Sequence, residues 1–177
     1  WNTRGFWAAR GYMREIKQAL VIKMLSACWI LGIQEPHLTP GRWPAFLDWV
    51  RDEQLYALGE PTQDIQEGVG ILSKQPLLPD WEHTYFIFAQ VLGHRRLKVW
   101  MVHWRLSPRG PTERLAQMEQ IYTYLKSRMQ ARRGPGPIQG AAQEDEVVVT
   151  FGDYNWVGFP EDRFYPEFMT LPPSMTW

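Results

Sequence analysis

Residues 147–156, "VVVTFGDYNW", join an apolar run to a turn that carries an acid and an amide two positions apart. The β-branched residues and the phenylalanine predict a buried strand, and Gly152 predicts a turn at its end. Side chains at a strand end lie at the rim of a sheet, a common location for binding and catalysis. Asp153 and Asn155 are therefore candidate site residues, although Asp, Asn and Gly also form ordinary turns for local backbone reasons.

The totals predict one globular domain. The chain has 177 residues, of which 45% are hydrophobic and ten are tryptophan, enough to bury a core across residues 1–177. Its 19 basic residues balance 19 acidic ones, so any binding of a polyanion must be local. No apolar stretch is long enough to span a bilayer and no signal peptide opens the chain, so we expect an intracellular protein with no membrane partner.

The first half predicts a helix followed by a strand. Residues 9–27 place an apolar stripe at helical steps of three and four: Met13, Ile16, Leu20, Met24 and Ala27. The run "CWILGI" then predicts a strand buried on both faces, with Cys28 and Trp29 as core residues. It exits into "QEPHLTPG", where two prolines prevent a regular continuation and leave Glu35 and His37 in a loop.

The second half is rich in strands. "GVGILSK" at 68–74, "TYFIFAQVL" at 84–92 and "LKVWMVHW" at 97–104 predict strands, the last two paired as a hairpin. Residues 111–129 predict a second helix, and 130–146 a surface loop before the final strand. This order of elements favours an α/β fold in which helices cover packed sheets.

The polar residues that directly follow the apolar runs occur in an order that is known from a protein family. They are Asn2 in "WNTRG", Glu35 in "GIQEPH", His103 in "WMVHWRLSP", and Asp153 with Asn155 in "GDYNW". In this order they resemble the endonuclease/exonuclease/phosphatase superfamily, which includes deoxyribonuclease I and abasic-site endonucleases. The resemblance covers nearly the whole chain and implies a four-layered α/β sandwich of two packed mixed sheets flanked by helices.

A narrower resemblance concerns the substrate. "WNTRGF", "QEPH" and "GDYNWVGFPEDR" are similar to the endonuclease domains of LINE-type (non-LTR) retrotransposons. That resemblance implies a nuclear enzyme that nicks DNA and shares a polyprotein with a reverse-transcriptase domain.

The superfamily resemblance also implies roles for the site residues. Glu35 would ligate Mg²⁺ or Mn²⁺ with help from Asn2, Asp153 would contribute to the metal site and orient the attacking water, and Asn155 would donate to a phosphate oxygen. Hard cations of this kind take oxygen ligands from one or two carboxylates and keep several waters, so the residue types suit the chemistry.

Histidine roles stay open at this point. The family places a catalytic Tyr or His near "VHWRLSP", so His103 is a candidate, with Trp104 as plausible and a purely structural histidine as the alternative. His37 lies between prolines and is more typical of an exposed loop residue than of a site residue. The loop sequence "RRGPGP" is a candidate contact to a DNA backbone, although short charged loops are more often solvated.

The sequence departs from the family at its end. It stops at "LPPSMTW", with neither the family's "SDH" nor the histidine which that motif supplies. We therefore expect a piece of a longer polypeptide that lacks its last strands and by itself cleaves DNA feebly or not at all. Two alternatives follow: an inactive remnant or nucleic-acid-binding fragment of the same fold, and a superfamily phosphatase that acts on a lipid or inositol phosphate.

Overall fold

The computed structural model describes residues 2–7, 10–63, 68–83, 85–93, 97–106, 110–132 and 145–153. The chain divides into two compact units, which are described separately. The first contains residues 1–105 and 143–153, and the second contains the remainder of the chain, including α3 (Pro111–Arg132). This helix confirms the one predicted over residues 111–129.

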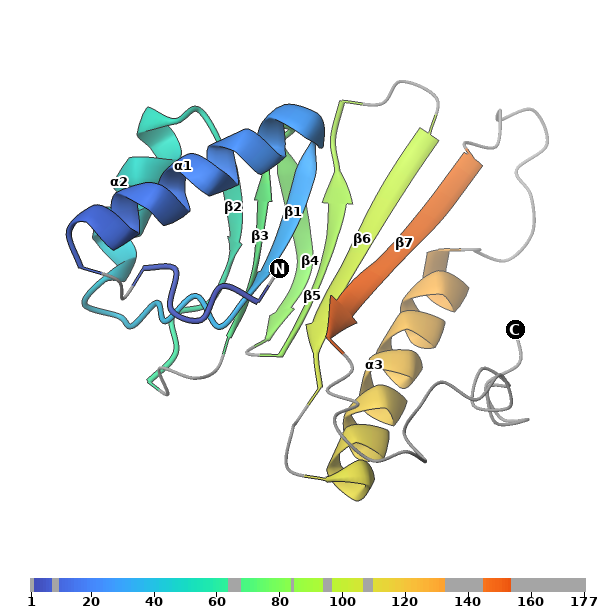
Figure 1. Cartoon of the computed structure of the whole chain (residues 1–177). Helices are drawn as coiled ribbons and strands as arrows, with labels where there is room; N and C mark the ends of the chain where they lie inside the picture. Colours follow the sequence, from blue (N-terminus) through green and yellow to red (C-terminus); the bar gives the residue numbers. More distant parts are fainter. Residues whose placement is uncertain are drawn as a thin grey trace. The chain divides into compact units, whose positions relative to one another are not determined.

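Two sheets form the first unit (Figure 1). Sheet A has the strand order β1-β3-β2, with antiparallel pairs, and consists of β1 (Ile30–Gln34), β2 (Tyr56–Gly59) and β3 (Val69–Ser73). Sheet B has the order β4-β5-β6-β7 and consists of β4 (Leu77–His83), β5 (Phe86–Val91), β6 (Leu97–Arg105) and β7 (Asp145–Asp153). Its last pair, β6 and β7, is parallel. The predicted hairpin is confirmed as the antiparallel pair β5–β6.

Successive side chains of a strand point to opposite faces of its sheet, so each sheet can present one apolar face. The two sheets pack against each other through these faces. Val69 and Ile71 of β3 form one buried cluster with Ile87 of β5 and Met101 of β6. Leu72, between Ile71 and Ser73, joins a different cluster on the opposite face of sheet A. The interior of the first unit is therefore divided by sheet A into two layers.

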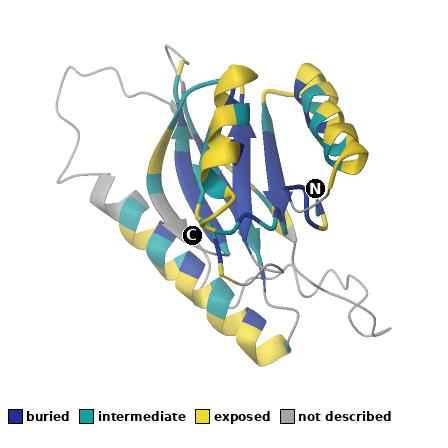
Figure 2. Cartoon of the chain, turned by 90° about the vertical axis from the view of Figure 1, so that its left-hand side faces the viewer, coloured by how far each residue is buried: buried dark blue, intermediate teal, exposed yellow. Residues whose placement is uncertain are grey.

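Helices α1 (Tyr12–Ala27) and α2 (Trp43–Asp52) cover the outer face of sheet A (Figure 1). Figure 2 shows the buried residues concentrated in the strands and the exposed ones along the helices. Rings from the N-terminal segment and α2 pack edge to face over this sheet: Phe6, Trp7, Phe46 and Trp49. Helices over a pair of packed sheets confirm the predicted α/β class.

The N-terminal segment is hydrogen-bonded to the end of β1. Asn2 forms a parallel bridge with Gln34, so sheet A is also mixed once this segment is counted. The Thr3 hydroxyl donates within 2.9 Å to the backbone carbonyls of Gln34 and Glu35. From α1, the Lys17 ammonium donates to the carbonyls of Thr3 and Arg4, each at 3.0 Å. These bonds fix Asn2 beside Glu35.

Several sequence predictions about burial are wrong. In α1 the buried residues are Val21 and Leu25, whereas Met13, Ile16 and Leu20 of the predicted stripe are exposed. The reason is that two apolar stripes compete for the core, and the stripe that faces sheet A is the one with Val21 and Leu25.

Five other residues, in two segments, are more exposed than predicted. Cys28 is exposed and Trp29 is 58% exposed, because β1 begins only at Ile30. Val147 to Val149 are 36–42% exposed, since β7 has a strand neighbour on one side only, among the described strands of sheet B. No helix in the described part of the chain is long and apolar enough to cross a membrane.

Candidate active site

Glu35 is the first residue after β1 and the centre of the candidate site. Its backbone adopts φ +50°, a left-handed conformation that is uncommon for a residue other than glycine and costs free energy. The conformation is held because the Glu35 N–H donates to the Gly68 carbonyl (3.1 Å) and its own carbonyl accepts from the Gly5 N–H (2.8 Å). The turn directs the carboxylate back over the end of the sheet, where it is 19% exposed.

Two side chains hold the same carboxylate oxygen. Asn2 Nδ2 donates to Glu35 Oε1 at 3.1 Å, and Arg105 Nη2 donates to that atom at 2.7 Å. The Asn2 amide is itself oriented, because its Oδ1 accepts from the Arg4 N–H at 3.0 Å. The Arg105 side chain is 13% exposed, so this ion pair is shielded from water and screened less than a surface pair.

The strand directions explain why these residues meet. His103 contacts the Ile33 carbonyl, and two residues further along both strands Arg105 contacts Glu35, so β6 and β1 advance together toward one rim. In β7, Asp153 is the register partner of Arg105. Figure 1 shows β6 and β7 ending side by side. The structure therefore brings Asn2, Glu35 and Arg105 together at this rim and pairs the backbone of Arg105 with that of Asp153, whereas the expected approach of the Asp153 and Asn155 side chains stays a prediction.

Two parts of the predicted site lie outside the described residues. They are the side chain of Asp153 and all of Asn155. Their roles stay predictions. The "RRGPGP" loop also falls outside the described residues from 133 onward.

His103 lies between the two sheets and is 1% exposed. Its Nε2 is 3.1 Å from the Ile33 carbonyl oxygen of β1, and its Nδ1 is 3.3 Å from the Phe151 carbonyl oxygen of β7. The ring also stacks on Phe151 at 4.7 Å between centroids. These contacts fit the structural alternative raised for this histidine, in which its ring joins the two sheets behind the site.

Acid should weaken the fold through this residue. Burial lowers the pKa of His103 to about 4, while the carbonyls of Ile33 and Phe151 oppose the shift. The unfolded chain, with the ordinary pKa near 6.5, takes up the proton first as the pH falls, so stability present above pH 6.5 is lost toward pH 4. We expect the free energy of unfolding to fall by about 2 kcal/mol between about pH 7 and pH 5 on this account.

Urea denaturation across this pH range checks the expectation. The variant His103→Gln should lose this part of the pH dependence, whereas His37→Gln, in the half-buried loop after β1, should keep it. Equal pH dependence in both variants would show that another group is responsible.

A hard divalent cation needs oxygen ligands, which this rim offers through Glu35 and Asn2. Among the described residues, no three or more His, Cys, Asp or Glu side chains are grouped so that they could hold a metal ion, and the described carboxylate at this rim is that of Glu35. Mg²⁺ is commonly held by one or two carboxylates and otherwise by water, and both described contacts of Glu35 use Oε1. The residues therefore fit a hydrated cation, which would share Glu35 with Arg105.

Arg105 is a residue of the candidate site that the sequence prediction did not include. The signal was available, because Val99, Met101, His103 and Arg105 alternate along β6 on one face. An arginine at the end of an inward face needs an acidic partner, since a buried unpaired charge is costly. The partner, 70 positions away, is Glu35.

Comparison with solved structures identifies the fold. The chain matches TDP2 from C. elegans with a TM-score of 0.54 and 18% identity, over 93% of this chain and 48% of that one. It matches ANGEL2, a 2′,3′-cyclic phosphatase, with a TM-score of 0.55 and 15% identity, over 82% and 44%. It matches a hairpin-deletion mutant of beta toxin from Staphylococcus aureus with a TM-score of 0.55 and 14% identity, over 90% and 64%.

These matches show that the chain has the fold of the endonuclease/exonuclease/phosphatase superfamily, the deoxyribonuclease I-like fold. It spans about half of the length of the TDP2 and ANGEL2 chains. No family model and no curated protein matches the sequence.

Proposed function

We propose that this chain is part of a metal-dependent phosphodiesterase, and specifically of the DNA-nicking endonuclease of a LINE-type retrotransposon polyprotein. The observation that carries the proposal is the joint hold of Asn2 and Arg105 on the Glu35 carboxylate, at the rim where β7 ends in Asp153. An amide, a guanidinium and the Glu35 carboxylate at one rim, to which Asp153 would add a second carboxylate, suit a phosphodiester, whose reaction develops charge on the phosphoryl oxygens.

The proposed roles of the residues follow from their charges. Glu35, with Asn2 beside it, would hold Mg²⁺ or Mn²⁺, and Asp153 would complete the site. When bound, such a cation stabilises negative charge on the phosphoryl oxygens. Arg105 places a positive charge at the same rim and fixes the rotamer of Glu35, while Asp153 orients the attacking water and Asn155 donates to a phosphate oxygen.

The choice of DNA rests on the motifs rather than on the fold. The segments "WNTRGF", "QEPH" and "GDYNWVGFPEDR" support the retrotransposon assignment. In such an enzyme the partners are DNA and the reverse-transcriptase domain of the same polyprotein, and the site of action is the nucleus.

Nicking of supercoiled plasmid tests the proposal. The complete protein that carries this chain should convert supercoiled to open-circular DNA in the presence of Mg²⁺ and not in excess EDTA, and Asp153→Ala should abolish the conversion. Sphingomyelin and inositol phosphates serve as competing substrates. If sphingomyelin or inositol phosphates are hydrolysed faster than the plasmid, the protein is a phosphatase that acts on a lipid or inositol phosphate. If neither the plasmid nor these substrates are hydrolysed, the chain is an inactive remnant that binds nucleic acid.

A further inference from the structure

Lys17, on α1, binds the turn that follows Asn2. Its Nζ donates to three consecutive backbone carbonyls, those of Thr3 and Arg4 at 3.0 Å and that of Gly5 at 3.4 Å. A lysine ammonium has three N–H donors, so these carbonyls can take all of them. Among the residues that the structure describes, no carboxylate pairs with this ammonium. Backbone dipoles therefore supply its negative counterpart.

The conformation of the turn explains why a cation is bound there. Arg4 and Gly5 have φ values of +42° and +80°, a region that is unfavourable for a residue with a Cβ such as Arg4. The carbonyl oxygens of residues 3–5 all lie within reach of one Nζ atom, so their partial negative charges repel one another. A compact ammonium offsets this repulsion and stabilises a turn that the backbone alone does not favour.

The opposite side of the same turn contacts the candidate site. The Gly5 N–H and the Thr3 hydroxyl both donate to the Glu35 carbonyl, at 2.8 and 2.9 Å. The Arg4 N–H donates to Asn2 Oδ1 at 3.0 Å, and Asn2 Nδ2 donates to the Glu35 carboxylate at 3.1 Å. The turn is thus bonded to α1 through its carbonyls and to the candidate site through its donors.

We propose that Lys17 is a positioning residue for the candidate metal site, and that its ammonium is what keeps Asn2 on the Glu35 carboxylate. The proposal rests on the proposed function, because a bound cation is what the positioned carboxylate would serve. Lys17 is not itself a ligand, since a positive charge repels a metal ion. It acts through the turn, where a small displacement of a positioned group is costly to the reaction.

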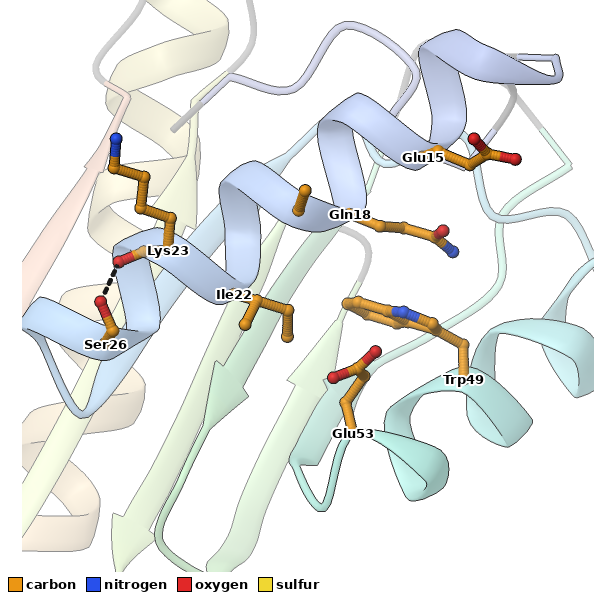
Figure 3. A pocket seen from close by; sticks show the side chains of 8 residues that line it. Glu15, Gln18, Ile22, Lys23, Ser26, Trp49 and Glu53 are labelled. Atoms are coloured by element: carbon orange, nitrogen blue, oxygen red, sulfur yellow. Dashed lines mark hydrogen bonds between the residues drawn. The ribbon is translucent and has the colours of Figure 1, made fainter.

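Lys23 offers a matched control on the same helix. It is exposed, borders a groove between α1 and α2, and directs its ammonium away from Trp49 and Glu53 (Figure 3). Lys23→Ala therefore removes the same charge from α1 as Lys17→Ala does, without removing a bond to the turn.

Amide hydrogen exchange of the complete protein tests the hold on the turn without reference to activity. The N–H groups of Gly5 and Trp7 donate to carbonyls of the loop after β1. In Lys17→Ala these two amides should exchange at least about tenfold faster, because the turn opens more often. Lys23→Ala should exchange like the parent. Unchanged exchange in Lys17→Ala would overturn the proposal.

Chemical rescue separates the ammonium from the packing of the side chain. The n-propylammonium ion matches the atoms that Lys17→Ala removes, so it should restore slow exchange, whereas tetramethylammonium, which has the same charge and no N–H donor, should not. If Lys17→Ala does not fold, Lys17→Gln, with two N–H donors and no charge, should show the faster exchange and its rescue. Rescue by both ions, or by neither, would contradict a specific role of the ammonium.

Thermal unfolding with Mg²⁺ links the turn to the site. The Mg²⁺ concentration that gives half of the rise in melting temperature should increase about tenfold in Lys17→Ala, stay unchanged in Lys23→Ala and return with n-propylammonium. The KM for plasmid should not change, because Lys17 does not touch DNA in this proposal. Faster exchange with an unchanged Mg²⁺ requirement would show that Lys17 only supports the fold. If the parent itself gains no stability from Mg²⁺ and cleaves no DNA, the proposed function fails and the positioning role fails with it, whatever the exchange rates are.

Discussion

Replacing Glu35 with glutamine is expected to lower the metal-dependent cleavage rate of the complete protein by at least about 100-fold. Glutamine keeps the shape of the side chain and an oxygen that accepts from Asn2 and Arg105. It removes the negative charge, which is what a divalent cation requires of its ligand. The loss should therefore reflect the missing charge rather than a collapsed rim.

Thermal unfolding separates metal binding from catalysis. Mg²⁺ should raise the melting temperature of the parent protein, because a ligand that binds only the folded state stabilises it. Glu35→Gln should show no such rise, while Glu60→Gln, the same change in an exposed loop, should behave like the parent. A rise of equal size in Glu35→Gln would place the cation elsewhere in the protein.

A second substitution distinguishes lost charge from a lost partner. In Glu35→Gln the shielded Arg105 guanidinium loses its counter-charge, which should destabilise the fold by about 1–3 kcal/mol. Adding Arg105→Gln should recover most of this stability and none of the activity. Recovery of cleavage in the double variant would show that Glu35 serves only to neutralise Arg105.

Strand ends were the part of this site that the sequence could predict. Apolar runs that stop at a polar residue predicted the ends of β1 and β7, next to Glu35 and at Asp153, because the period of two and the turn residues act locally. The rim contact between Asn2 and Glu35 also follows from the resemblance, since both motifs close neighbouring segments of one sheet. Local pattern thus predicted where the strands that carry the candidate residues end, while the roles of these residues stay predictions.

Other features depend on contacts that no local pattern contains. The pairing of Arg105 with Glu35 requires two sheets to pack in one particular register. In α1, Ile16 and Val21 are both apolar, and only the surface offered by sheet A and the N-terminal rings decides that Val21 is buried. Helix α2 was not predicted, although a proline stands in its first turn and its buried residues Phe46 and Val50 lie at helical spacing.

The second large effect is expected from Gly32→Ala, in the middle of β1. A Cβ added at Gly32 would lie 2.9 Å from the His103 ring and closer still to the Phe151 ring. These two rings stack on each other, and the His103 nitrogens are at the Ile33 and Phe151 carbonyls. Neither ring can move without giving up one of these contacts, so the absence of a side chain at Gly32 is what lets the two sheets approach.

Two opposing effects decide whether Gly32→Ala raises or lowers the free energy of unfolding. Alanine in a strand gains about 0.5–1 kcal/mol over glycine from the unfolded chain, whereas forcing an extra carbon into packed rings costs about 3 kcal/mol. We expect a net loss of about 2 kcal/mol in urea denaturation. Gly41→Ala, at a position where an added Cβ meets nothing within 4 Å, should cost far less.

Gly32→Ala should also disturb the candidate active site. Gly32 lies three residues before Glu35 on β1, and displacing the His103 ring would shift β1 relative to β6 and so separate Glu35 from Arg105. Gly32→Ala should therefore lower the cleavage rate even at temperatures where it stays folded, because small displacements of positioned groups are costly to catalysis. Full activity in a folded Gly32→Ala protein, or stability equal to that of Gly41→Ala, would show that the sheets can separate here without disturbing the rim.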